Sequence, residues 1–271
     1  MGRNTKRVEL TAIDGVWQQL RLEAEAAAAE EPTLASLLHC AILSQGTMAD
    51  ALANRLARRL GGADLDPLMI REFCIEAFGD DPEILDAFDR DMRAVRERDP
   101  ACTSYLQPFL YFKGFAALQA HRVAHWLWHK NRHALAFHLQ SLVSEIFQVD
   151  IHPAAVLGKG LFLDHATGVV IGETCVVGDD VSILQNVTLG GTGKQRGDRH
   201  PKIGRGVLIS VGAKILGNIK VGDDSRIAAG SVVLHDVPKG ATVAGVPAKV
   251  IRGPVAAHPS VSMDHFLGDG I

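Results

Sequence analysis

An apolar residue recurs at every sixth position through the C-terminal half of the chain, and this period constrains the fold more than any other feature. Neither the 3.6-residue period of a helix nor the two-residue alternation of a strand produces a strict period of six. The pattern is therefore an internal repeat, typical of a solenoid. The repeating positions are Ile151, Leu157, Leu163, Val169, Cys175, Val181 and Val187, and then Ile203, Ile209, Ile215, Val221, Ile227 and Val233.

Each hexad has room for one short strand and one turn. Three hexads then complete a coil of 18 residues, and stacked coils form a triangular prism of parallel sheets with one apolar side chain per hexad pointing inward. The fourth residue after each apolar position is often small, which fits a tight corner. These small residues include Ala155, Thr167, Ala213, Ser225 and Ser231.

The period breaks between Val187 and Ile203, which are sixteen residues apart. One hexad plus an insertion of ten residues, approximately 190–201, accounts for this spacing. Insertions in solenoids leave the scaffold as loops, often on the binding face. We expect a lid or substrate loop, because the insertion carries four cationic or imidazole side chains. These are Lys194, Arg196, Arg199 and His200. The alternative is a solvated loop without function.

The N-terminal half has helical rather than hexad spacing. Proline and glycine breaks separate the apolar patterns, and Pro32 with Thr33 is typical of a helix start. With 271 residues, of which 47% are hydrophobic, the chain is long enough for two domains. Helices are expected from residue 32 onward and over 49–60, 68–78, 83–98 and 109–147.

Composition excludes several classes of protein. The net charge of −3 argues against a nucleic-acid-binding surface. The N-terminus lacks the apolar segment of a signal peptide, and the chain lacks an apolar run long enough to span a membrane. Four cysteines follow neither metal nor disulfide spacing. We expect a soluble cytoplasmic protein.

Four histidines follow one another at intervals of four residues: His121, His125, His129 and His133. Any adjacent pair on a helix could bind a metal ion. Four in line would span roughly 18 Å, too far for one ion. No carboxylate or thiolate lies between them. Packing beside Trp126 and Trp128 is the preferred interpretation, and no metal site is expected.

Catalytic candidates lie where the prism begins. His165 lies between Asp164 and small residues, a setting in which an imidazole can be held to accept a proton. Asp150 precedes it by fifteen residues, close to one coil, so stacking could bring a carboxylate to the ring and orient it. A structural histidine is the alternative. Arg199 and His200 of the insertion could reach over a neighbouring coil.

At this point several motifs together resemble the bacterial serine O-acetyltransferases, a family of hexapeptide-repeat acyltransferases. The resemblance covers roughly residues 10–271, and it includes the helical half, which most acyltransferases with such repeats do not share. The matching motifs are residues 96–100, 111–120, 150–155, 164–168, 181–185, 190–194, 197–201 and 244–248.

The resemblance implies an α+β architecture. An α-helical oligomerisation domain at residues 1–145 precedes a left-handed parallel β-helix, the catalytic domain, at 146–251. A flexible tail follows at 252–271. The handedness comes only from the resemblance, because it departs from the usual right-handed crossover. It also implies homotrimers with active sites between adjacent prisms, commonly paired as hexamers.

The implied reaction transfers acetyl from acetyl-CoA to the hydroxyl of L-serine, giving O-acetyl-L-serine and CoA, the first step of cysteine biosynthesis. L-cysteine is the implied feedback inhibitor. The implied roles are His165 as general base, Asp150 as its orienting carboxylate, Asp99, Asp164, Arg199 and His200 around serine, and Gly191, Thr192, Ala213 and Ala229 along CoA. A tail ending in Ile271 implies binding to O-acetylserine sulfhydrylase.

Three alternatives stay open at this stage. Another hexapeptide acetyltransferase, acting on a sugar or antibiotic hydroxyl, would keep the histidine base without needing Asp99 and Arg199. A hydratase resembling γ-class carbonic anhydrase would need His152, His165 and His200 to converge on one metal ion. A scaffold or regulatory module would release no thiol from acetyl-CoA.

Overall fold

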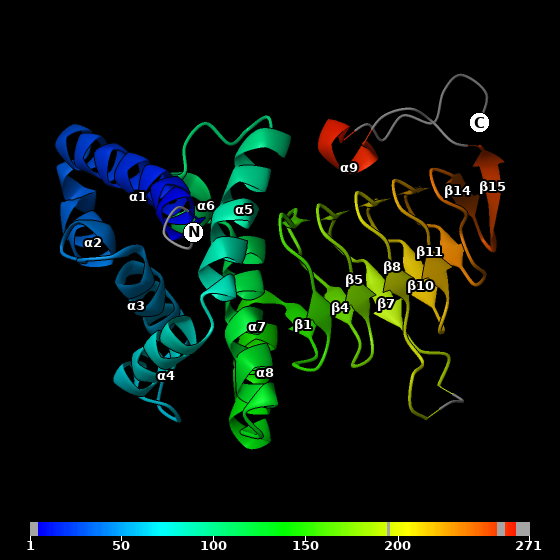
Figure 1. Ribbon diagram of the computed structural model, residues 1–271, viewed down its shortest axis with the longest axis horizontal. Helices are drawn as coiled ribbons and strands as arrows, with labels where there is room; N and C mark the ends of the chain where they lie inside the picture. The colour runs from blue at the N-terminus through cyan, green and yellow to red at the C-terminus, as the bar shows by residue number, and fades with distance from the viewer. Residues whose placement is uncertain (1–4, 194–195, 254–257, 264–271) are drawn as a thin grey trace.

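The computed structural model describes residues 5–193, 196–253 and 258–263, and it divides into a helical half and a stack of short strands (Figure 1). The first helix, α1, lies in the half that was expected to be helical, but its bounds were not predicted. In chain order the helical half contains α1 (Thr5–Glu30), a 3₁₀ turn (Pro32–Leu34), α2 (Ala35–Leu38), a π-helical turn (His39–Leu43), α3 (Met48–Leu60), α4 (Pro67–Asp80), α5 (Glu83–Arg98), α6 (Leu106–Leu110), α7 (Lys113–His129) and α8 (His133–Phe147).

Local signals in the sequence explain most helix ends. The Thr47 hydroxyl accepts a hydrogen bond from the Asp50 amide and caps α3, and Asp66 with Pro67 caps α4 in the same way. The predicted helices over 49–60, 68–78 and 83–98 are confirmed within two residues. The single helix predicted over 109–147 is wrong, because the chain turns at residues 111–112 and 130–132 to form three packed helices.

The strands form three parallel sheets that wind into a prism of about five coils. Sheet A contains β1 (Val149–Ile151), β4 (Val169–Ile171), β7 (Thr188–Gly190), β10 (Lys214–Leu216) and β13 (Val232–Val233). Sheet B contains β2 (Val156–Leu157), β5 (Val176–Val177), β8 (Lys202–Ile203) and β11 (Lys220–Val221). Sheet C contains β3 (Phe162–Leu163), β6 (Ser182–Ile183), β9 (Leu208–Ile209), β12 (Arg226–Ile227), β14 (Thr242–Gly245) and the antiparallel β15 (Ala248–Arg252).

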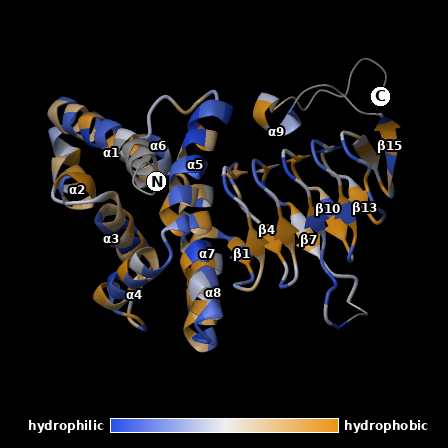
Figure 2. Ribbon diagram, viewed as in Figure 1, coloured by the Kyte–Doolittle hydropathy of each residue, from blue (hydrophilic) through white to orange (hydrophobic). Residues whose placement is uncertain are grey.

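Apolar side chains fill the interior of the prism, and the strands are correspondingly hydrophobic (Figure 2). The expectation of inward apolar positions is confirmed, but the register drawn from the six-residue period is wrong in one place. Leu163 pairs with Ile183, so the first coil has twenty residues rather than eighteen. Val169, Cys175, Val181 and Val187 are buried as well, at a second inward position two residues before the main one.

The insertion before β8 is therefore shorter than predicted, and the first coil contains a second, smaller insertion. Val177 pairs with Ile203, a spacing of 26 residues, so eight residues rather than ten are added to an 18-residue coil. Two further residues are added in the first coil, where His165 (φ 52°) and Ala166 (φ 60°) both adopt the left-handed conformation. Both insertions fall at sites that the sequence marks for function.

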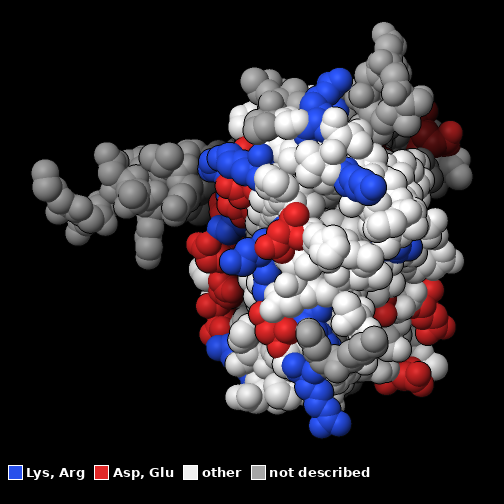
Figure 3. All heavy atoms as spheres, turned by 90° about the vertical axis from the view of Figure 1, so that its right-hand side faces the viewer, with Lys and Arg blue, Asp and Glu red and all other residues white. Residues whose placement is uncertain are grey.

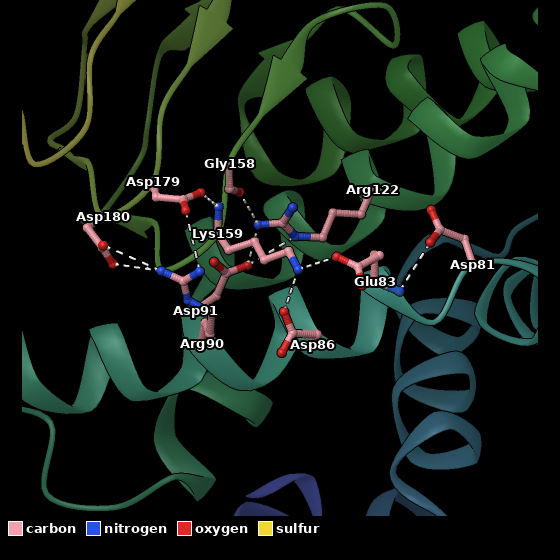
Figure 4. A network of polar contacts seen from close by, with 10 residues as sticks. All are labelled: Asp81, Glu83, Asp86, Arg90, Asp91, Arg122, Gly158, Lys159, Asp179 and Asp180. Atoms are coloured by element: carbon pink, nitrogen blue, oxygen red, sulfur yellow. Dashed lines mark hydrogen bonds and ion pairs between the residues drawn. The ribbon is translucent and has the colours of Figure 1, made fainter. Parts of the chain in front are cut away.

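Ion pairs join the helical half to the prism (Figure 4). Asp91 on α5 is completely buried and accepts hydrogen bonds from Arg122, Gln119 and the backbone amide of Leu161. Arg122 also donates to the carbonyl oxygen of Gly158, at 2.9 Å. Burial raises the pKa of Asp91, and the nearby Arg122 guanidinium opposes that rise.

One lysine and one arginine complete this interface nearer to solvent. Lys159 pairs with Glu83 and Asp86, and Arg90 lies 3.4 Å from both Asp179 and Asp180. Because the contacts come from α5, α7 and two successive corners of the prism, they fix the helices against its first coils.

The four histidines spaced four residues apart, here called the histidine stripe, are a packing feature and do not share one helix. His133 begins a new helix, so only His121, His125 and His129 share α7. His121 is buried, and burial lowers its pKa well below the usual value, so it is neutral near pH 7. The ring of His125 hydrogen-bonds the carbonyl oxygen of Pro153 at 2.7 Å. The stripe therefore packs α7 against the prism, in agreement with the preferred interpretation.

The C-terminal segment returns to the helical half. The short helix α9 (Pro259–Ser262) lies beside α5 (Figure 1), and the buried Ser182 hydroxyl donates to the carbonyl oxygen of Ser260 at 2.8 Å. Ile271 lies outside the described residues. At the far end of the prism, acidic and basic side chains are interspersed (Figure 3). Within the part of the chain that is described, no helix is both long and apolar enough to cross a bilayer.

Candidate active site

A pocket at the edge where sheet C meets sheet A brings three predicted site residues together. Asp99 follows α5, while Asp164 and His165 follow β3, and the first turn of α7 closes the pocket. The lining residues are Asp99, Tyr111, Phe112, Lys113, Gly114, Phe162, Leu163, Asp164 and His165. Two carboxylates beside an imidazole suit a ligand that carries an ammonium group and a hydroxyl.

His165 projects from a tight turn at this edge. The Ala166 amide donates to the Asp164 carbonyl oxygen at 2.5 Å, and this places His165 at the centre of a three-residue turn. The His165 side chain is 76% exposed, and its Nε2 lies 3.8 Å from Asp164 Oδ1. The imidazole is therefore open to a reactant on one side and near a carboxylate on the other.

Asp150 does not pair with His165 within this chain. It lies on β1 in sheet A, between inward Val149 and Ile151, and its Oδ1 accepts a hydrogen bond of 2.6 Å from Gln140 Nε2 on α8. The expected stacking of Asp150 under His165 is not formed, because Asp150 pairs with Val170 in the next coil, five residues beyond His165. The carboxylate closest to the His165 ring among the described ion pairs is Asp164.

Arg199 and His200 lie at the other edge of sheet A, where it meets sheet B. Thr174, at the corner between β4 and β5, holds them: its hydroxyl oxygen accepts from the backbone amides of Arg199 (3.0 Å) and His200 (3.1 Å). Arg199 Nη2 pairs with Glu173 Oε2 at 2.6 Å. The hydrogen bond from Arg199 lowers the pKa of Glu173, so this carboxylate stays ionised.

The surroundings of His200 decide which ring nitrogen carries the proton. The backbone amide of Thr174 donates to His200 Nδ1 at 3.2 Å, and an amide can only donate. Burial lowers the pKa of His200, with Arg199 as a second cause, so the ring is neutral near pH 7. Its proton then lies on Nε2, which is available as a hydrogen-bond donor.

Two glycines lie beside this ring, and Gly172 leaves space for it. A Cβ at Gly172 would lie 2.1 Å from His200 Nε2, and a Cβ at Gly191 would lie 3.5 Å from the same atom. Gly191 is thus placed beside His200, and Thr192 follows it on the exposed loop. The two alanines predicted along CoA lie at the opposite edge of sheet A. Ala213 points into the core, whereas Ala229 is exposed.

The predicted site residues therefore form two clusters at opposite edges of one prism side. Asp99, Asp164 and His165 form the first, and Arg199 and His200 form the second. At about 3.3 Å per residue, the strands and corners of sheet A separate them by on the order of 15 Å. Within one chain the two clusters do not meet.

Sequence reasoning missed the residues that support these clusters. Glu173 and Thr174 carry no motif, but they lie 26 residues before Arg199 and His200, which is the spacing of one enlarged coil. A correct register would have aligned them. Lys113 and Gly114 lie in a stretch that matched the family, but their contacts with the prism are tertiary.

The arrangement does not gather three histidines. His152 lies at the edge between sheets A and B, where its ring packs against Trp128 and Phe137, and His165 lies at the opposite edge. In the described ranges no group of three or more His, Cys, Asp or Glu side chains is placed to hold a metal ion. The histidine convergence required by the hydratase alternative is not formed within this chain.

Family models match both halves of the chain. A family model for the N-terminal region of serine acetyltransferases matches residues 16–120, and a model of six bacterial transferase hexapeptide repeats matches residues 200–235. The serine acetyltransferase of Salmonella typhimurium is 55% identical over 257 residues, which cover 94% of both chains.

Solved structures extend the similarity to three dimensions. A crystal structure of serine acetyltransferase from Vibrio cholerae is 53% identical, with a TM-score of 0.92 over 94% of this chain and 98% of that one. A serine acetyltransferase in complex with cysteine is 50% identical, with a TM-score of 0.91 over 93% and 98%. One from Brucella abortus in complex with coenzyme A is 52% identical, with a TM-score of 0.89 over 92% and 99%. The chain belongs to the serine acetyltransferase family.

Proposed function

We propose that the chain transfers acetyl from acetyl-CoA to the hydroxyl of L-serine with His165 as the general base. Family membership gives the reaction and its place in cysteine biosynthesis. The observation that supports the roles of individual residues is the pocket in which Asp99, Asp164 and His165 meet. It offers a proton acceptor to the hydroxyl and two carboxylates to the ammonium group of a small amino acid.

The chemistry requires a base at this position. The serine hydroxyl is a weak nucleophile near neutral pH, so its proton must leave as the oxygen attacks the thioester carbonyl. An exposed imidazole can approach the hydroxyl, and the imidazolium formed is stabilised by a nearby carboxylate. Asp164 is near enough to contribute, and Asp150 is our proposed orienting carboxylate in the assembled enzyme.

We infer that a neighbouring subunit completes the site. Asp99 and Asp164 are suited to the serine ammonium, and Arg199 to its carboxylate, because a guanidinium offers two parallel donors. Since the two clusters lie at opposite edges of sheet A, side-by-side prisms would bring the first cluster of one chain to the second of its neighbour. This favours a homotrimer, and the helical half at residues 1–145 is the proposed surface for pairing trimers into hexamers.

His200 is proposed to stabilise the oxyanion of the tetrahedral intermediate. Its neutral ring carries the proton on Nε2, so it can donate a hydrogen bond without first gaining a proton. Loss of such a donor typically costs about 3 kcal/mol of transition-state stabilisation. Gly172 would then act by leaving room for the ring, and Gly191 would lie in contact with it.

Acetyl-CoA is proposed to lie between neighbouring prisms, beside Gly191 and Thr192 of one chain and Ala229 of the next, because these residues lie at opposite edges of sheet A. The coenzyme A complex of the Brucella abortus enzyme supports a coenzyme A site in this family. Ala213 would shape the wall only, because its side chain is buried and its carbonyl oxygen already accepts a hydrogen bond from Thr188. The cysteine complex of a related enzyme supports L-cysteine as an inhibitor that competes for the serine pocket.

A thiol-release assay tests the proposed function directly. Purified protein with acetyl-CoA should release CoA with L-serine, and only weakly with sugar or antibiotic hydroxyl acceptors. Faster release with one of those acceptors would favour the alternative acetyltransferase. No release with any acceptor would contradict an enzymatic role.

Removal of the Arg199 side chain should weaken serine binding. We expect Arg199→Ala to raise the KM for serine about 10- to 100-fold, since a charge-assisted hydrogen bond contributes about 1.5–3 kcal/mol. The KM for acetyl-CoA should change little. Arg205→Ala is the matched control, because Arg205 is 69% exposed and lies at another corner of the prism. An unchanged KM for serine in Arg199→Ala would reject the carboxylate contact.

The C-terminal residue is proposed to bind O-acetylserine sulfhydrylase. A terminal carboxylate beside the isoleucine side chain of Ile271 resembles an amino-acid product, so it could enter the active site of that enzyme. Deletion of Ile271 alone should abolish co-elution with the sulfhydrylase while leaving acetyltransferase activity intact. Retained binding after this deletion would reject the proposal.

A further inference from the structure

The turn that carries His165 is strained and needs support from outside the prism. His165 and Ala166 both have positive φ, a conformation that residues with a Cβ adopt only when their surroundings impose it. The turn also contains the two residues by which the first coil exceeds eighteen. It therefore departs from the regular stacking that holds the corners of the later coils.

The first turn of α7 contacts this loop at both ends. A Cβ built on Gly114 would lie 2.3 Å from the Leu163 carbonyl oxygen and 2.9 Å from the Ala166 Cβ, so the helix backbone packs directly on the loop. Lys113 Nζ donates a hydrogen bond to the Thr167 hydroxyl. His165 lies between these two points of attachment.

We propose that Lys113 and Gly114 are positioning residues, which hold the loop at residues 164–167 and thereby place the His165 imidazole for proton transfer. The inference rests on the proposed role of His165 as general base. Neither residue needs to touch the reacting atoms. Gly114 acts because only a residue without a Cβ allows so close an approach. Lys113 acts through its hydrogen bond to Thr167.

Substitution at Gly114 should separate positioning from folding. Alanine favours a helix over glycine, so Gly114→Ala would not weaken α7 itself, but its methyl group must push the loop away. A displacement of about 1 Å in a catalytic group can cost roughly 100-fold in rate. We expect kcat to fall about 10- to 100-fold, with the KM for acetyl-CoA within about twofold of the parent value. Gly79→Ala is the matched control, because a Cβ at this helical glycine meets nothing within 4 Å.

The hydrogen bond gives a second, independent test. Lys113→Ala and Thr167→Val should each lower kcat by about tenfold, and the double variant should fall no further than the more affected single one, because both remove the same contact. Thr167→Ser keeps the hydroxyl and should restore kcat. Lys130→Ala is the control, because it removes an exposed ion pair, that of Lys130 with Asp80, elsewhere on the helical half.

The outcomes distinguish this inference from the proposed function. A kcat near the parent value in Gly114→Ala would overturn the inference, and so would losses that multiply in the double variant. It would also be overturned if kcat fell only in proportion to the fraction of unfolded protein, measured by thermal unfolding. If Gly114→Ala does not fold, the Lys113 and Thr167 variants decide. Normal turnover in His165→Ala would instead reject the base itself, whatever the loop variants show.

Discussion

His165→Ala should lower kcat by about 10²- to 10⁴-fold, the range that a general base contributes. The substituted enzyme would have to deprotonate the serine hydroxyl without a positioned acceptor. The protein should stay folded, because the side chain is 76% exposed. Steady-state thiol release at saturating serine and acetyl-CoA measures the effect.

A second histidine provides the control for this prediction. His235 is also exposed on the prism, away from the pocket, and His235→Ala should keep the parent kcat. His165→Asn adds a variant that keeps a polar side chain without a titratable nitrogen, and it should be as slow as His165→Ala. Turnover within a few-fold of the parent enzyme in both His165 variants would remove His165 as the base.

Asp91→Ala should destabilise the fold by about 3–5 kcal/mol, the usual cost of leaving a buried charge without its partner. Arg122 would remain buried, with the hydrogen bonds of its Nε and Nη2 to Asp91 lost. The Leu161 amide would lose its acceptor as well. Chemical denaturation at fixed protein concentration measures the free energy of unfolding, since any assembly would make it depend on concentration.

The same interface supplies a control variant that is expected to lose little stability. Asp86 also pairs across it, with Lys159, but it is 46% exposed and Glu83 shares the lysine (Figure 4). Asp86→Ala should therefore cost less than about 1 kcal/mol, as for most exposed ion pairs. Equal losses in Asp86→Ala and Asp91→Ala would show that burial does not set the strength of these contacts.

The sequence predicted the kind of fold well but missed its register. The six-residue period indicated a prism with apolar residues inside, because inward positions must repeat whenever coils stack. It could not show that Val169 belongs to a different inward position from Leu163, since both are apolar and six residues apart. This shift of register needs two residues in the left-handed conformation. Nothing in the local sequence of His165 and Ala166 requires that conformation.

Motifs alone predicted the site residues, but not their grouping. The family resemblance pointed to five site residues: Asp99, Asp164, His165, Arg199 and His200. The expected pairing of Asp150 with His165 is absent within the chain. Which residues share an edge depends on where each corner falls, and two insertions shift the corners.

The sequence by itself determined the solenoid, the preceding helices and the chemical groups available for catalysis, because periodicity and side-chain chemistry are local properties. Only the tertiary structure decided that these groups divide between opposite edges of sheet A, and that the start of α7 packs against the loop of His165. These are consequences of register and of close contact between segments far apart in the chain. A repeat pattern contains neither.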